Sequence, residues 1–213
     1  MKRRVLVQAA SLVFAMGLFG AALPQAQAAD EAPEVMIKRL SDEVLDAIKA
    51  DKSIQAGDTS KVLAFVESKI MPNVDFQRMT AAAVGPAWRQ ASPEQKKRLQ
   101  DEFKVLLVRT YSGALAQVNH QTVSVKPMRS AAGDTDVVVR TEVRGRGDPI
   151  QLDYRLEKTP GQGAGWKIYN LNVLGVWLVE TYRSQFAQEI NSKGVDGLIT
   201  ALSERNKTNA KKG

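Results

Sequence analysis

The side chains that could carry covalent or metal chemistry are few in this chain of 213 residues. There is one histidine, His120, and no cysteine, whereas a zinc site needs several convergent nitrogen, sulfur or carboxylate ligands. A serine triad lacks support as well, because His120 is the only imidazole base and Ser184 lies outside any G-x-S-x-G turn. We therefore expect no metal site, no nucleophilic triad and no cofactor.

Two further patterns could suggest catalysis. The glycine-rich segment at 161–165 lies between two predicted strands, so it has no helix N-terminus with which to bind a dinucleotide. Asp153 is the nearest candidate for a general base with a tyrosine donor. Strand alternation places Asp153 opposite Leu152 and Tyr154, on the face predicted to be wet. An isomerase- or hydrolase-like enzyme that uses Asp153 is therefore the alternative function.

The segment Trp166–Phe186 changes period in its middle, and we expect the rest of the chain to be arranged around it. Alternation over Trp166–Leu174 predicts a strand. After Gly175, apolar residues recur every three or four positions over 176–190, which predicts a helix. A strand that runs through one glycine into a helix returns that helix across the sheet or its open end.

The first half of the chain predicts helices. Apolar stripes and caps place them over Glu34–Ala50, from Asp58 or Thr59 to Pro72, over Phe76–Val84, as a turn over Trp88–Gln90, and over Pro93 to about Val118. The longest begins with a capping box in which Ser92 is the N-cap and Gln95 follows three residues later. We expect this helix to lie on a sheet.

The second half predicts an antiparallel meander with one covered face and one wet face. Its four strands are expected over Thr122–Pro127, Asp134–Arg144, Ile150–Lys158 and Trp166–Leu174. Gly194 then separates the helix over 176–190 from a last helix over Val195–Arg205. The pattern predicts an α+β fold, a four-stranded antiparallel sheet covered by helices around a large apolar interior.

The first 28 residues resemble a cleaved export signal. They contain a basic start, an apolar stretch and the A-x-A site Ala26-Gln27-Ala28. A retained membrane anchor is the alternative, but the stretch holds polar residues and ends at Pro24. We expect residues 29–205 to form one domain and 206–213 a basic disordered tail. An exported chain without cysteine fits a bacterial periplasm.

The charge of the chain argues against a nucleic-acid partner. The formal net charge of +7 includes three basic residues of the signal, so the remainder carries +4. Four more basic residues follow Glu204, which leaves the folded body near neutral. A nucleic-acid-binding domain would instead show a basic patch or stripe.

Short motifs in order along the chain resemble the MlaC family of periplasmic phospholipid-carrying proteins, also described as toluene-tolerance or ABC-transporter auxiliary proteins. The matching segments are Pro72 with Asp75-Phe76, Gly85-Pro86-Ala87-Trp88-Arg89, Ala91-Ser92-Pro93-Glu94-Gln95, Phe103, Thr110-Tyr111, Asp153-Tyr154-Arg155-Leu156, Trp166-Lys167-Ile168-Tyr169, Gly175-Val176, Leu178-Val179 and Tyr182-Arg183-Ser184-Gln185-Phe186. Three positions depart from the family pattern. Asn170 and Leu174 stand where acidic residues are common, and Trp177 stands where small residues are usual.

The resemblance implies a nuclear-transport-factor-like α+β half, an added helical subdomain, and an apolar cavity between sheet and helices that takes lipid tails. It implies two partners, an inner-membrane ABC transporter complex with an MCE-domain subunit and an outer-membrane lipoprotein–porin assembly. The function implied is a periplasmic carrier, not an enzyme, which shuttles phospholipid between the outer and inner membranes and maintains outer-membrane lipid asymmetry. We expect a monomer.

Each methylene group of a lipid tail that is exposed to water costs about 0.8 kcal/mol, so a lipid carrier must enclose the tails with apolar side chains. The carrier hypothesis therefore assigns inward-facing apolar residues to the tails. Expected tail contacts are Leu106, Tyr111, Val139, Val143, Leu152, Tyr154, Ile168, Val176 and Val179, with Tyr169, Leu171 and Val173 as rivals to Ile168. Candidates for headgroup or partner contacts are Arg140, Arg144, Arg155 and Arg183, which could equally be solvated surface charges. A filled core in a structural adaptor is the alternative for the apolar set.

Overall fold

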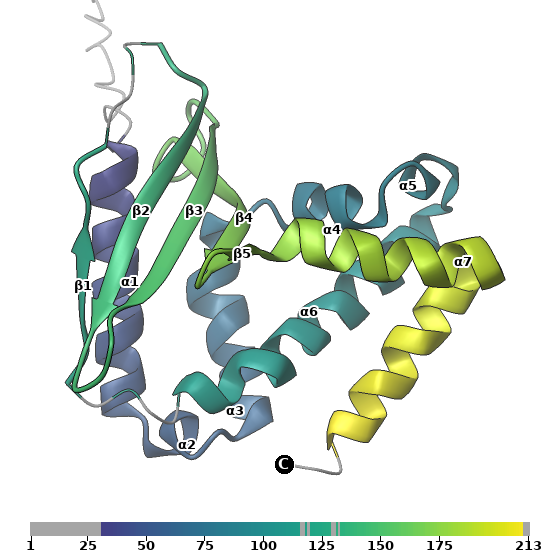
Figure 1. Cartoon of the computed structure of the whole chain (residues 1–213), viewed down its shortest axis with the longest axis horizontal. Helices are drawn as coiled ribbons and strands as arrows, with labels where there is room; N and C mark the ends of the chain where they lie inside the picture. The colour runs from purple at the N-terminus through teal and green to yellow at the C-terminus, as the bar shows by residue number, and fades with distance from the viewer. Residues whose placement is uncertain (1–30, 116–117, 119, 129–130, 132, 211–213) are drawn as a thin grey trace, which may run out of the picture.

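The chain forms a twisted sheet backed by one long helix, with a group of helices packed beyond the last strand (Figure 1). The computed structural model describes residues 31–115, 118, 120–128, 131 and 133–210. The predicted export signal, residues 1–28, lies outside the described residues. Within the described part, no helix combines the length and hydropathy needed to cross a membrane.

The helices of the first half follow the predicted pattern. They are α1 (Pro33–Ala50), α2 (Lys52–Gln55), α3 (Thr59–Phe65), the π-helical turn η1 (Val66–Ile70), the 3-10 turn η2 (Met71–Asn73), α4 (Phe76–Val84), α5 (Ala87–Gln90) and α6 (Pro93–Leu115). Asp51, Asp58 and Asp75 each cap a helix by accepting hydrogen bonds from backbone N–H groups. The predicted capping box is confirmed, since Gln95 N donates to Ser92 Oγ and Ser92 N donates to Gln95 Oε1.

The predicted meander is confirmed and gains one short strand. The strands β1 (Thr122–Val125), β2 (Asp136–Arg144), β3 (Ile150–Lys158), β4 (Trp166–Val173) and β5 (Val176–Trp177) pair in chain order, all antiparallel. Leu174 and Gly175 both have positive φ and reverse the chain, so that Val176 pairs with Val173. The helix expected from residue 176 therefore begins two residues later, as α7 (Leu178–Ala210).

A β-bulge in β4 resolves which of its residues share a face. Arg155 and Leu156 of β3 face Asn170 and Ile168, so Tyr169 is an extra residue between them. The alternation therefore shifts by one position in the middle of β4. Ile168 lies on the same face as Leu171 and Val173, and Tyr169 lies on the opposite face.

The end of the chain differs from the expected tail. Gly194 kinks α7 with a φ of 68°, where the sequence predicts a break between two helices. The second part nevertheless continues to Ala210, because Asn206 is buried and its Nδ2 donates to the main chain and carboxylate of Glu102. The prediction of a disordered tail is wrong for residues 206–210.

Three separate hydrophobic clusters hold the fold together. The first joins α1 to the sheet, and the second joins α4, α6 and α7 around Phe103, whose ring lies 4.9 Å from that of Tyr182 and 5.2 Å from that of Phe186. The third lies around α3. α6 packs chiefly on α7, α3 and α4, so it does not lie on the sheet as expected. The sheet and the helical group thus have distinct buried clusters, which meet where Leu171 and Val173 of β4 pack against the helical one and Val74 packs against both.

Loss of the capping box should destabilise the whole domain. Replacing Ser92 by Ala removes the acceptor of Gln95 N, which should lower the free energy of unfolding by about 1 kcal/mol. Urea unfolding followed by circular dichroism measures this change. Ser60→Ala is the control, because Ser60 is exposed on the first turn of α3. Equal stability of the two variants would contradict the role of Ser92.

Candidate functional site

The apolar face of the sheet is closed at one end and open at the other. Cross-strand partners point to the same face, so the register defines rows across the sheet. The rows, from the end covered by α1, are Val137–Leu156–Ile168, Val139–Tyr154–Leu171, Thr141–Leu152–Val173–Val176 and Val143–Ile150. All of the first row is buried, whereas Val176 and Ile150 in the last two rows are 52% and 44% exposed. Apolar side chains thus become more accessible toward the β4–β5 turn.

The expected tail contacts fall into two groups in this arrangement. Leu106, Val139, Ile168 and Val179 are buried inside the packed clusters. Val143, Leu152 and Tyr154 are half-buried on the sheet, while Tyr111 of α6 and Val176 of β5 are exposed. A fully buried residue has no free space beside it for a ligand, so only the second group borders accessible space in this conformation. The assignment of all nine residues to lipid stays a prediction.

A strained leucine sits at the open end of this face. Leu174 has a φ of 52°, a conformation that residues with a branched side chain rarely adopt, and its side chain is 65% exposed. Its N–H donates to the carbonyl of Gln151, which holds the turn beside β3. The turn therefore presents an apolar side chain to solvent where asparagine or glycine would fit the backbone with less strain.

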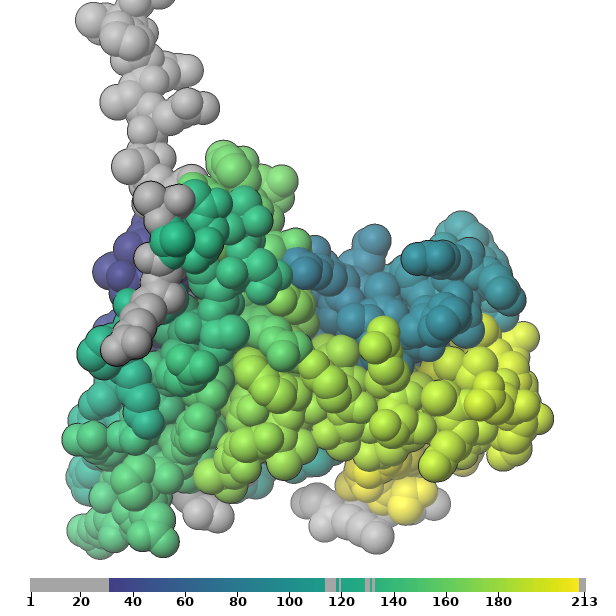
Figure 2. Space-filling view, turned by 45° about the horizontal axis from the view of Figure 1, so that its top comes forward, coloured from purple at the N-terminus to yellow at the C-terminus, as the bar shows by residue number. Residues whose placement is uncertain are grey.

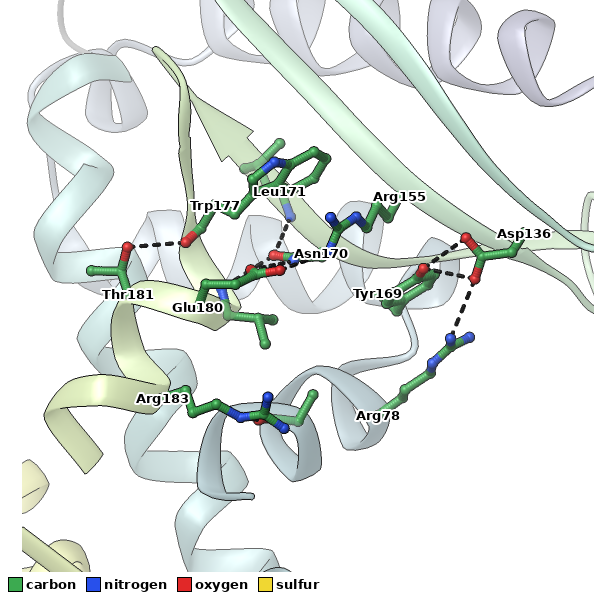
Figure 3. A network of polar contacts seen from close by, with 12 residues as sticks. Arg78, Asp136, Arg155, Tyr169, Asn170, Leu171, Trp177, Glu180, Thr181 and Arg183 are labelled. Carbon is green, nitrogen blue, oxygen red and sulfur yellow. Dashed lines mark hydrogen bonds and ion pairs between the residues drawn. The ribbon is translucent and has the colours of Figure 1, made fainter. Parts of the chain in front are cut away.

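Asn170 connects the sheet to the start of α7 on the opposite face. It is 1% exposed, and its Oδ1 accepts hydrogen bonds from the N–H groups of Leu171 and Val179, at 2.9 and 3.2 Å. Val179 N lies in the first helical turn, where N–H groups have no partner within the helix. Asn170 Nδ2 donates to Glu180 Oε2 at 2.8 Å. The strand thus caps the helix in place of Trp177, whose side chain cannot do so (Figure 3).

Glu180 and Arg155 extend this connection to the surface. Arg155 Nη1 lies 2.7 Å from Glu180 Oε1, and its guanidinium stacks 4.2 Å from the centre of the Trp177 ring. Burial opposes ionisation of Glu180, but the hydrogen bonds from Asn170 and Arg155 outweigh it, so its pKa lies below the ordinary value. Glu180 is therefore ionised in the folded protein near neutral pH.

A second polar group lies farther along the same face. Tyr169 donates its hydroxyl to Asp136, and the guanidinium of Arg78 stacks 3.6 Å from the centre of the Tyr169 ring. Arg78 also pairs with Asp136 (Figure 3). A second ion pair joins Arg78 to Glu157. Burial, together with the hydrogen bond to Asp136, raises the pKa of Tyr169 to about 12. These groups tie α4 to β2, β3 and β4, and they satisfy one another without an obvious reactive centre.

Asp153 does not lie on a wet surface as predicted. It is 4% exposed, and its Oδ2 accepts from Gln151 Nε2 at 2.8 Å. Its row on the polar face contains Arg140, Asn172 and Trp177, whose side chains flank it. The neighbouring Tyr154 points to the other face of the sheet, as the alternation predicted, so it cannot serve as the tyrosine donor that the enzyme alternative requires. Among the described residues no cluster of acidic and histidine side chains could hold a metal ion.

The four candidate arginines are not brought into one cluster. Arg140 and Arg155 lie on the polar face, and Arg144 pairs with Glu142 at the end of β2. Arg183 lies on α7 and donates from Nε to the carbonyl of Ala82 at 3.0 Å. A headgroup at the open apolar rows would not contact all four, and their role stays a prediction.

Sequence reasoning singled out Asn170 only as a departure from the family pattern and Tyr169 only as a rival to Ile168, and it missed their partners Glu180 and Arg78. One signal was present, because asparagine is depleted in strands and β4 contains two, Asn170 and Asn172. An amide in the middle of an aromatic and branched strand indicates a specific hydrogen-bonding task. Glu180, the partner on α7, could not be found this way. The β-bulge that turns Asn170 toward it arises from pairing with β3 and cannot be predicted from the neighbouring residues in the sequence.

Three comparisons with known proteins agree with this architecture. The family model described as MlaC protein matches residues 38–204. The chain is 27% identical over 177 residues to the toluene tolerance protein ttg2D of Pseudomonas putida, covering 83% of this chain and 81% of that protein. It is 22% identical over 178 residues to the intermembrane phospholipid transport system binding protein MlaC of Haemophilus influenzae, covering 83% of each.

A solved structure is similar over the same region. The phospholipid-binding protein of Ralstonia solanacearum, determined in complex with a phospholipid, is 50% identical with a TM-score of 0.79, covering 83% of this chain and 98% of that one. Fold and sheet together define an α+β protein with a helix-packed antiparallel sheet and an incompletely covered apolar face. The chain belongs to the MlaC family.

Removal of the Asn170 amide should uncouple the sheet from α7. Asn170→Ala leaves the N–H groups of Leu171 and Val179 without their acceptor, so the free energy of unfolding should fall by about 2 kcal/mol. Urea titration measures the loss, with Asn191→Ala on the exposed surface of α7 as the control. Asn170→Asp keeps the acceptor but places a carboxylate against Glu180, so it should be less stable at neutral pH than at mildly acidic pH. No pH dependence in that variant would contradict the contact.

Replacement of Leu174 should stabilise the protein. Leu174→Asn relieves the positive-φ strain and should raise the free energy of unfolding by about 0.5–1 kcal/mol. Leu174→Ala is the matched control, because it shortens the side chain yet keeps the unfavourable backbone. Thermal unfolding distinguishes the two, and an alanine variant as stable as the asparagine variant would refute the strain argument.

Proposed function

We propose that this protein is a periplasmic phospholipid carrier that holds lipid tails against the open end of the apolar sheet face. The observation that carries the proposal is the gradient of exposure, in which Val143, Leu152 and Val176 stay accessible while equivalent positions under α1 are closed. A relative with half of its residues identical binds a phospholipid, which supports the same ligand class here.

The physical requirement on such a carrier is strong. Two acyl chains of about 16 carbons each would expose apolar surface worth on the order of 20 kcal/mol if they crossed water unprotected. The sheet and the helical group have distinct buried clusters that meet through the partly buried Leu171 and Val173 of β4. A site between them would therefore require only these boundary contacts to open, while the buried side chains of each cluster stay packed. Tails would first contact Leu152, Val173 and Val176, and would reach Val139 or Leu106 only if the clusters parted.

The proposed route follows from the family. The carrier would take phospholipid from one membrane and deliver it to the other, contacting an outer-membrane lipoprotein–porin assembly and an inner-membrane ABC transporter complex with an MCE-domain subunit. Such traffic would maintain the lipid asymmetry of the outer membrane. The relatives are named as binding and transport proteins, which supports carriage over catalysis.

Native mass spectrometry tests the proposal. Protein secreted to a bacterial periplasm and purified without detergent should carry about one phospholipid, the load of a single enclosed pocket. Leu152→Trp should fill the open rows and greatly reduce the bound lipid, because Leu152 is half-buried on the apolar face. Val35→Trp is the control, since Val35 is exposed on α1. Lipid-free wild-type protein that takes up none from liposomes would refute the proposal.

A further inference from the structure

A hollow of about 410 Å3 lies between α4, α5 and α7, and no residue that lines it comes from the sheet. Its lining is largely apolar and includes Ala81, Ala82, Pro86 and Trp88, which we call its floor. Arg89 and Arg183 also line it and are exposed to solvent. We name this hollow the α4–α7 groove. Figure 2 shows the two segments that form it, α4–α5 in blue and α7 in yellow-green, meeting on one side of the molecule.

The groove has positive charge that the rest of the protein does not neutralise. Arg78, also in its lining, is already paired with Glu157 and Asp136. Arg89 and Arg183 have no carboxylate partner within the described part of the chain, and no acidic residue lines the groove. The Nζ of Lys96 lies 5.8 Å from the centre of the Trp88 ring and adds a further cation nearby.

A hydrogen bond to the main chain of α4 fixes the position of the Arg183 guanidinium group. Its Nε donates to the carbonyl of Ala82, which fixes the guanidinium across the gap from α7 to α4 (Figure 3). The two terminal nitrogens keep their N–H groups, which match a carboxylate in a bidentate geometry. Gly85 turns the chain beside Arg183 with a φ of 73°, and this backbone angle favours glycine there, whereas a Cβ at 3.9 Å from Arg183 Nε would make only an ordinary contact.

Two segments that carry the family resemblance meet here and not at the apolar sheet face. They are Gly85–Arg89 and Tyr182–Phe186, which lie about a hundred residues apart in the sequence and both contribute residues to the lining of the groove. Tyr182 and Phe186 serve the helical core, but Arg89 and Arg183 are exposed and contribute nothing to it. Charged guanidinium groups would not stabilise apolar lipid tails, so a role in binding the tails does not explain these arginines.

We propose that the α4–α7 groove is a docking site for an acidic, amphipathic segment of a partner protein, with carboxylates on Arg89 and Arg183 and an apolar side chain on the alanine and tryptophan floor. Charge complementarity favours this occupant, and the small open hollow suits one or two side chains better than a lipid. The site goes beyond lipid carriage, because it gives the carrier a means of recognising a partner protein.

The test uses isothermal titration of the full mature protein with short peptides of alternating Leu and Glu, and with matched peptides of alternating Leu and Lys. Only the acidic peptide should bind. Arg89→Glu and Arg183→Glu should each weaken binding at least about tenfold, the loss expected for one charge-assisted hydrogen bond. Arg183→Gln removes the charge but keeps a donor for Ala82 O, so it separates lost charge from misfolding.

Arg146→Glu is the control, because it makes the same change of charge on the exposed β2–β3 turn. Equal weakening by Arg146→Glu, or no binding of the acidic peptide, would overturn the proposal. Binding of inorganic phosphate or glycerol 3-phosphate without the peptide would also overturn it and indicate a small-anion site. The lipid content of the same samples separates the two proposals, since a loaded carrier that ignores the peptide refutes only the groove.

Discussion

The hydrogen bonds of one buried amide, Asn170, determine how the two parts of this protein fit together. A strand and a helix that follow each other at a tight turn leave unpaired N–H groups at the helix start. Trp177, directly before α7, cannot supply the acceptor. Asn170 supplies it from the neighbouring strand and binds Glu180 as well, so the orientation of α7 is set by the sheet. The helical core around Phe103 is built on that orientation.

The bulge at Tyr169 makes this arrangement compatible with an apolar sheet face. Without an extra residue, strict alternation would place Ile168 and Asn170 on the same face and expel Leu171 to the other. With it, β4 keeps Ile168, Leu171 and Val173 on one side, while Tyr169 and Asn170 turn to the polar side. One inserted residue thus keeps Asn170, which caps α7, off the face proposed for lipid, and Leu171 and Val173 on that face make further apolar contacts with the helices.

The proposed carrier and the proposed docking groove assign different tasks to different regions. Lipid tails would need accessible apolar surface without fixed polar partners, which the open rows around Leu152 and Val176 offer. Recognition of a protein would need fixed charges at a solvent-exposed edge, which Arg89 and Arg183 offer. Because the groove contains no sheet residue, a partner bound there could leave the apolar rows free for transfer of the lipid.

The sequence by itself determined most of the elements, because local periods and caps depend only on neighbouring residues. It predicted α4, the capping box at Ser92, the antiparallel meander and the break at Gly194, and its motifs identified the family. Only the tertiary structure decided the rest. The faces of β4 depend on a bulge that pairing with β3 creates, and the burial of Asp153 depends on three neighbouring strands. The α4–α7 groove joins residues that are 101 positions apart, a contact that no local pattern encodes.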